Sequence, residues 1–421
     1  MKGGATLPKY TPNASTRHLT ISKADDSTPA TAANWNPGIE ALADNEAYDF
    51  AHLGHTQAIG WGEEFAASAG FLGPGTDFAG AAAYGPLSGR WALAAIDNGT
   101  PAWAVYGGNG LDAGNPLAWD AFTGPPAPAF PVIDMAITED PSTADVWIVF
   151  VVTGTDNGSA AVYPWTGPAW GTGLTLGVTG NVRGIEATTL GAYAIVAIAV
   201  DTAGSKGGTQ LQSSNNRWTG PTTTTTFTAG LPVMPAGSSW CLKSNGTSVL
   251  AIPYKGGFGA STNVWKTTDG HTWTNVATLA FLAASDNVVG LAWDPLLELW
   301  VLALQTTTPT VYFYTSPDGV AWTSAGTAPT THLSVTDMAA VDGALVCALA
   351  EVSSGGKSGT IWSGDGGATW WPGKAELALN EQASFSGYTR PRIAASDQGS
   401  LLWNNYYARF SKLTGFPAAS L

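Results

Sequence analysis

Short apolar runs, each closed by a polar turn, follow one another along most of the chain. Examples of these runs are VWIVFVV at 146–152, YAIVAIAV at 193–200 and LWVLALQ at 299–305. Runs of this length that are rich in Val, Ile, Tyr and Trp and are bounded by Gly, Asn, Asp or Pro predict β-strands. No stretch reaches the about 18 apolar residues that a membrane-spanning helix needs. The pattern therefore predicts an all-β chain.

The strands repeat in a unit of about 50 residues. Three turns carry Asp, Gly and Trp in the same order, namely TTDGHTW at 267–273, SPDGVAW at 316–322 and SGDGGATW at 363–370. Similar intervals lead back to Trp218, Trp170 and Trp119. Each unit therefore reads as three strands, a turn, and a fourth strand that the Trp opens.

A second landmark in each unit is a strand with small residues that ends in a polar turn. These strands begin at Leu93, Met135, Ile185, Cys241, Leu291, Met338 and Ile393. Their alanines, such as Ala94 and Ala136, suit the crowded centre of a ring. Sheets of this kind bury both faces only when they pack radially against one another. We therefore predict a seven-bladed β-propeller of four-stranded antiparallel blades.

The seventh unit has room for about three strands before Leu421. We expect its outer strand to come from the segment HTQAIGWGEEFAASAGF at 55–71, so that the two ends of the chain pair and no sheet edge stays open. The predicted propeller therefore spans residues 56–421 and is closed by pairing of its N- and C-terminal strands.

Residues 1–55 have a different character, since the first 34 are rich in Thr, Ser, Pro, Asn and Ala and cannot form a core of their own. The following NWNPGIEALADNEAYDFAHL predicts a short helix, with Asn36 as N-cap and Pro37 in the first turn. An extended arm with a short amphipathic helix suits docking onto another subunit.

Composition narrows the function classes. The chain has 17 basic and 31 acidic residues and a net charge of −14, which argues against binding to nucleic acid or to an anionic membrane. Only 11% of its residues are charged, whereas 52 are Gly and 26 Pro, which disfavours helix-rich folds. Cys241 and Cys347 lie in apolar stretches and are expected to be buried free thiols. No signal peptide is evident, so synthesis in a cytoplasm is expected.

The turn SGDGGATW resembles the Asp-box, or BNR repeat, whose pattern is Ser-x-Asp-x-Gly-x-Thr-Trp. The resemblance implies a turn between the third and fourth strands of a propeller blade, outside any active site. Its Asp would accept backbone N–H bonds, its Gly would adopt positive φ and its Trp would pack between sheets. The residues assigned this structural role are Asp269, Gly270, Trp273, Asp318, Gly319, Trp322, Asp365, Gly367 and Trp370. Asp-boxes occur in sialidases, other glycosidases, sorting receptors and assembly factors, so the motif does not select a function.

Sialidase chemistry requires three arginines on the substrate carboxylate, a Tyr and Glu nucleophile pair and an Asp acid/base. The Arg-Ile-Pro signature of sialidases is absent here. Four arginines stand just before predicted inner strands and are candidate anion- or ligand-binding residues at one mouth of the channel: Arg90, Arg183, Arg390 and Arg392. Acidic residues at the other strand ends are interpreted as turn formers: Asp97, Glu139, Asp294, Asp342 and Asp397. We assign no catalytic residue, no metal site and no cofactor.

The segment TPATAANWNPGIEALADNEAY resembles N-terminal segments of bacteriophage tail fibres and other virion structural proteins. The resemblance implies that residues 1–55 bind other virion proteins and that the propeller projects from the particle as part of an oligomer. The leading hypothesis is a non-enzymatic virion protein, as a tail-associated, decoration or host-surface-binding propeller.

A host surface glycan or receptor is the partner expected of such a propeller. Loop aromatics that could stack on sugars are Tyr163, Trp165, Tyr406 and Tyr407, although most tryptophans are expected to pack between blades. The alternative is a sialidase-like or other glycoside hydrolase that acts on surface glycans. A third class is a host-encoded assembly factor.

Overall fold

The computed structural model describes much of the chain from residue 60 to 414. The described ranges are 60–66, 77–97, 102–109, 119–122, 124–127, 130–154, 159–178, 181–202, 205–215, 218, 223–227, 239–254, 263–282, 286–306, 310–328, 333–341, 344–351, 358–372, 392–396, 399–403 and 409–414. The chain divides into two units, Met1–Gly60 with Gly415–Leu421 and Trp61–Thr414. The predicted arm with its helix lies outside the described residues.

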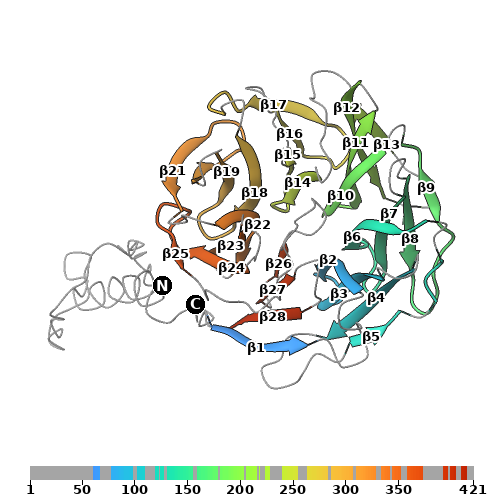
Figure 1. Cartoon of the computed structure of the whole chain (residues 1–421). Coiled ribbons are helices and arrows are strands. Elements are labelled where there is room, and N and C mark those ends of the chain that lie inside the picture. The colour runs from blue at the N-terminus through green and yellow to red at the C-terminus, as the bar shows by residue number, and fades with distance from the viewer. Residues whose placement is uncertain are drawn as a thin grey trace, which may run out of the picture. The chain divides into compact units, whose positions relative to one another are not determined.

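The described residues form seven four-stranded sheets, in each of which the innermost strand pairs antiparallel with the second strand (Figure 1). The innermost strands are β2 (Asp77–Gly85), β6 (Val132–Glu139), β10 (Asn181–Leu190), β14 (Ser239–Ser244), β18 (Asn287–Asp294), β22 (Leu333–Val341) and β26 (Arg392–Ser396). The second strands are β3 (Arg90–Asp97), β7 (Trp147–Thr153), β11 (Tyr193–Thr202), β15 (Val249–Tyr254), β19 (Leu299–Gln305), β23 (Ala344–Glu351) and β27 (Gly399–Trp403). The third strands are β4 (Ala102–Asn109), β8 (Ser159–Trp165), β12 (Ser205–Ser214), β16 (Asn263–Thr267), β20 (Val311–Ser316), β24 (Ser358–Ser363) and β28 (Arg409–Thr414). The outer strands are β5 (Trp119–Ala121), β9 (Leu174–Leu176), β13 (Thr223–Phe227), β17 (Thr274–Thr278), β21 (Thr323–Thr327), β25 (Trp371–Pro372) and β1 (Gly60–Ala66).

The sheets stand around a common centre (Figure 1). Each innermost strand contacts the next, from β2 through β6, β10, β14, β18, β22 and β26 back to β2. The prediction of an all-β propeller built from four-stranded antiparallel sheets is therefore confirmed. One sheet has the order β1-β28-β27-β26, so a strand from the start of the second unit forms the outer edge of a sheet from its end. That strand, β1, falls within the segment 55–71.

The strand assignment of the first unit was wrong by one strand. LAAIDNG, which begins at Leu93, belongs to the second strand β3, and the innermost strand is β2, with sequence DFAGAAAYG. Both strands are rich in alanine, so residue size alone does not distinguish them. The channel is lined instead by Ala81–Ala83 of β2. Arg90 and Asp97, as the ends of β3, therefore do not stand at the ends of an innermost strand.

The second strands make the core of the ring. In β7 the six residues from Trp147 to Val152 are all buried, because both faces of the strand are covered by sheets. Cys241 and Cys347 are free and buried, as expected.

The three Asp-Gly-Trp turns share one hydrogen-bond pattern. In the turn before β21, the Asp318 carboxylate accepts from the backbone N–H groups of Val320 (2.8 Å) and Ala321 (3.2 Å) and from the Ser316 hydroxyl (3.0 Å). The Val320 N–H bond holds the pKa of Asp318 below its ordinary value, against a smaller raising effect of burial. Asp269 accepts the equivalent bonds from the His271 and Thr272 N–H groups and the Thr267 hydroxyl, whereas Asp365 accepts from the Ser363 hydroxyl and from one backbone N–H, that of Thr369.

The glycines and tryptophans of these turns lie at the seams between sheets. Gly270, Gly319 and Gly367 have φ of +84°, +79° and +92°, and a Cβ on Gly319 would lie 2.7 Å from Leu250 of the preceding sheet. Trp370 stacks on Phe313 of the preceding sheet with ring centroids 4.0 Å apart. Trp273 is buried, whereas Trp322 is only half-buried.

Candidate functional site

Beta-bulges in the innermost strands place the first residues of the central site. The pairing of β6 with β7 shifts register before Asp134, and that of β22 with β23 shifts before Asp337. A bulge re-aims the side chain that follows it. Asp134 accepts from the backbone N–H of Ile185 on β10 (3.0 Å), and Asp337 accepts from that of Ile393 on β26 (3.1 Å). Each carboxylate therefore ties its strand to the next innermost strand.

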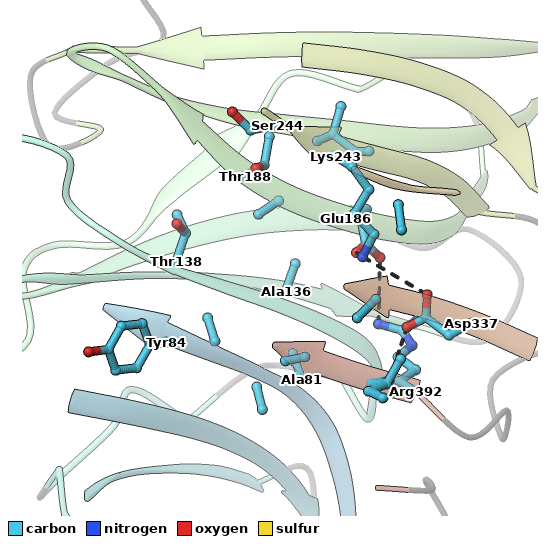
Figure 2. Close-up of a pocket in the computed structure, with 18 of the residues that line it drawn as sticks. Ala81, Tyr84, Ala136, Thr138, Glu186, Thr188, Lys243, Ser244, Asp337 and Arg392 are labelled. Atoms are coloured by element: carbon cyan, nitrogen blue, oxygen red, sulfur yellow. Dashed lines mark hydrogen bonds and ion pairs between the residues drawn. The ribbon is translucent and has the colours of Figure 1, made fainter. Parts of the chain in front are cut away.

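Two cations, Arg392 and Lys243, link Asp134 and Asp337 across the channel through a third carboxylate, that of Glu186. Arg392 Nη2 lies 3.2 Å from Asp134 Oδ1, and Arg392 Nη1 lies 3.9 Å from Glu186 Oε2. Lys243 Nζ lies 3.7 Å from Glu186 Oε1 and 3.9 Å from Asp337 Oδ1. Among the described residues, these five side chains form one network, the central charge network, to which β6, β10, β14, β22 and β26 contribute. Figure 2 shows four of its members, Glu186, Lys243, Asp337 and Arg392.

Small residues give the network its room. Arg392 on β26 reaches Asp134 on β6 past the intervening strand β2, which has Ala81 at the position after its bulge. Lys243 on β14 reaches Asp337 on β22 past β18, where the corresponding residue is Gly290. The result is a central cavity of about 620 Å³.

The walls of the central cavity carry hydroxyl groups and one half-buried indole. Figure 2 shows Tyr84, Thr138, Thr188 and Ser244 along the cavity. Four residues of the charge network lie toward one end of it: Glu186, Lys243, Asp337 and Arg392. Trp293 also lines the cavity. Its ring lies against the fully buried Trp300, with centroids 5.2 Å apart, which holds it in place.

These groups suit the recognition of a polyhydroxylated ring. Carboxylates and hydroxyls can accept and donate to sugar hydroxyls, and an indole face packs on the C–H face of a sugar ring. A concave site with a few placed polar groups is the usual form of a small-ligand site. Since Glu186 and Asp337 already face cations, the positions of their carboxylate oxygens are fixed by these contacts.

The candidate arginines do not gather in one place among the described residues. Arg392 lines the central cavity, whereas Arg90 lines a separate cavity with Asp120 and Asp145. Arg90 Nη1 donates to both carboxylate oxygens of Asp145 at 2.9 Å. The Arg183 side chain and the whole of Arg390 lie outside the described residues.

Two of the acidic strand-end residues do bind backbone N–H groups. Glu139 is 2% exposed and accepts from Leu87 (2.8 Å) and Ser88 (3.0 Å) in the turn of the neighbouring sheet. Glu139 therefore links two neighbouring sheets by hydrogen bonds, in addition to stabilising the turn of its own sheet. Asp294 accepts from Leu296 and Leu297, and burial raises its pKa above the ordinary value. Asp342 and Asp397 lie outside the described residues.

The loop aromatics that were candidates for sugar stacking pack on protein. Trp165 is 7% exposed and stacks on Phe122 of the neighbouring sheet, with centroids 4.8 Å apart. Tyr163 lies 5.4 Å from Trp103, centroid to centroid, and its burial raises its pKa. Tyr406 and Tyr407 lie outside the described residues.

Four residues of the central cavity were not predicted from the sequence, namely Glu186, Lys243, Asp337 and Trp293. The repeat nevertheless carries a signal for some of them. In each of four innermost strands we compare the residue that lies two positions after the first residue beyond the bulge. This residue is alanine in β6, β18 and β22, namely Ala136, Ala292 and Ala339, whereas in β10 it is Glu186. A charged residue at a repeat position that is otherwise Ala points into the channel.

The fold and the cavity define a class: an all-β propeller with a polar central cavity. Searches found no matching family model and no matching curated protein. Among solved structures, the chain is similar to a subtype N10 neuraminidase-like protein of A/little yellow-shouldered bat (10% identity, TM-score 0.45, 69% of this chain and 94% of that one). It is also similar to SapL1 lectin in complex with alpha methyl fucoside (13%, 0.44, 72% and 98%) and to a Hadza microbial sialidase (12%, 0.43, 66% and 64%). In the described residues no helix is long and apolar enough to cross a membrane.

Proposed function

We propose that this protein is a glycan-binding, seven-bladed Asp-box propeller of a phage or phage-like virion, with no catalytic role. The observation that supports glycan binding is the central cavity. Trp293 and several hydroxyl groups line it together with residues of the charge network. The three Asp-Gly-Trp turns support the Asp-box assignment, because their Asp, Gly and Trp make the turn and seam contacts that the motif implies.

Replacement of Trp293 by Ala is expected to weaken glycan binding about five- to thirtyfold, since a stacked indole contributes about 1–2 kcal/mol of binding free energy. The measurement is a glycan array followed by calorimetric titration of the best ligand. Trp103→Ala is a control variant outside the central cavity, and it should leave the affinity unchanged once folding has been verified. Binding that survives Trp293→Ala undiminished would place the glycan elsewhere on the protein.

The virion part of the proposal rests on the sequence segment 28–48, which resembles N-terminal segments of phage tail proteins. In this proposal residues 1–55 anchor an oligomer to other virion proteins, and residues 56–421 form the propeller, closed by pairing of its end strands. The expected location is the virion, after synthesis in the host cytoplasm.

An antibody against the propeller is expected to label purified particles in electron micrographs. Particles assembled with a chain that lacks residues 1–55 should lose this label, while the isolated propeller keeps its glycan affinity. Particles that carry no propeller at all would contradict the virion assignment and leave glycan binding as a separate question.

A glycoside hydrolase is the second candidate function. The observation in its favour is that Glu186 and Asp337, two carboxylates, both lie within 4 Å of Lys243 Nζ in the same cavity. Release of reducing sugar from a bound glycan, abolished by Glu186→Gln, would support this alternative over a purely binding role.

A further inference from the structure

Each described cation that lines the central cavity already faces carboxylates. Arg392 lies between Asp134 and Glu186. Lys243 lies between Glu186 and Asp337 (Figure 2). Arg392 is 6% exposed, so its positive charge acts on its partners with little screening by water. No described cation in the cavity faces open space with its charge uncompensated.

A ligand that carries its own carboxylate meets unfavourable charges in this cavity. Tight carboxylate recognition uses a guanidinium that can donate two bonds to the ligand. Here the ligand would have to compete with Asp134 or Glu186 for Arg392, and it would stand near the carboxylates of Glu186 and Asp337. Like charges at this range oppose binding, and the net charge of −14 adds long-range repulsion.

We propose that the central cavity selects nonacidic sugars, neutral or amine-bearing, and rejects sialic and uronic acids. The proposal rests on the glycan-binding function proposed above. The hydroxyls and Trp293 supply the attraction, since they interact with a sugar ring whatever its charge. The charge network supplies the selectivity, because unfavourable contacts to the wrong ligand are as effective as good contacts to the right one.

The test compares sugars that share a ring and differ in charge. The full chain is titrated with glucose, glucosamine and glucuronate, with the corresponding galactose and mannose series, and with N-acetylneuraminate. In the series that binds, the uronate is expected to bind at least about tenfold more weakly than the neutral parent, and added salt should narrow the gap. A uronate or N-acetylneuraminate that binds as tightly as the neutral sugars overturns this proposal and leaves glycan binding intact. Binding by none of the sugars overturns the glycan-binding function and this proposal with it.

A second measurement assigns the selectivity to the network. Glu186→Gln removes one carboxylate charge at nearly constant volume and is expected to raise the affinity for the uronate relative to its neutral parent about fivefold. Asp145→Asn is the matched control, because it removes a carboxylate that pairs with Arg90 in the other cavity. An unchanged ratio in folded Glu186→Gln protein would contradict the role of the network, and the wild-type panel remains decisive where the variant does not fold.

Discussion

Replacement of Arg392 by Met is expected to lower the free energy of unfolding by about 3 kcal/mol. The Arg392 side chain is 7% exposed and that of Asp134 is 3% exposed, so Met would leave the Asp134 charge buried without its cation. The backbone N–H groups of Met135 and Ile185 still donate to Asp134, which keeps the expected loss at the lower end for a buried pair. Chemical denaturation followed by tryptophan fluorescence measures the change.

The control for this variant is Arg90→Met. Arg90 makes a shorter contact, 2.9 Å to Asp145, but the Asp145 side chain is 50% exposed and water screens the pair. Exposed pairs contribute about 0–1 kcal/mol, so the control should change stability by no more than that. Equal losses in the two variants would mean that burial does not decide the strength of these ion pairs.

The repeat made most of the fold predictable from the sequence. Strands with Val, Ile and Trp at regular spacing, and turns such as SPDGVAW, placed the strand boundaries because turn chemistry and strand pattern are local properties. The first unit failed because β2 and β3 are both rich in alanine, and only the pairing of strands shows which of them faces the channel.

The site was much less predictable than the fold. Arg392 was a candidate from its position before a strand, but its partners Asp134 and Glu186 come from strands more than 200 residues away. A bulge decides where the Asp134 side chain points, and a one-residue shift of register is not visible in composition or spacing. For the same reason Trp293 could not be separated from the tryptophans that pack in the core.

Replacement of Gly326 by Ala is expected to destabilise the packing of the sheet β18–β21 (the fifth) against the sheet β22–β25 (the sixth). Gly326 lies on the outer strand β21, and a Cβ there would overlap the carbonyl oxygen of Ala368 and lie 2.8 Å from that of Gly367. Both atoms belong to the backbone of the Asp365 turn, which is held by the Ser363 and Asp365 hydrogen bonds, so neither can move aside like a flexible side chain. We expect a loss of about 3 kcal/mol, the upper range for overpacking.

Gly177→Ala separates this steric effect from the general effect of replacing glycine. A Cβ on Gly177 would have no atom within 4 Å, and neither glycine has positive φ. The control should therefore be neutral or stabilise the fold by up to about 1 kcal/mol, since alanine restricts the unfolded chain. If Gly326→Ala is also neutral, the sixth sheet can move away from the fifth at no cost, and the Asp-Gly-Trp turns do not set the spacing of the sheets. If only Gly326→Ala is destabilising, the contact between one sheet's turn and the preceding sheet's outer strand is a fixed part of the ring.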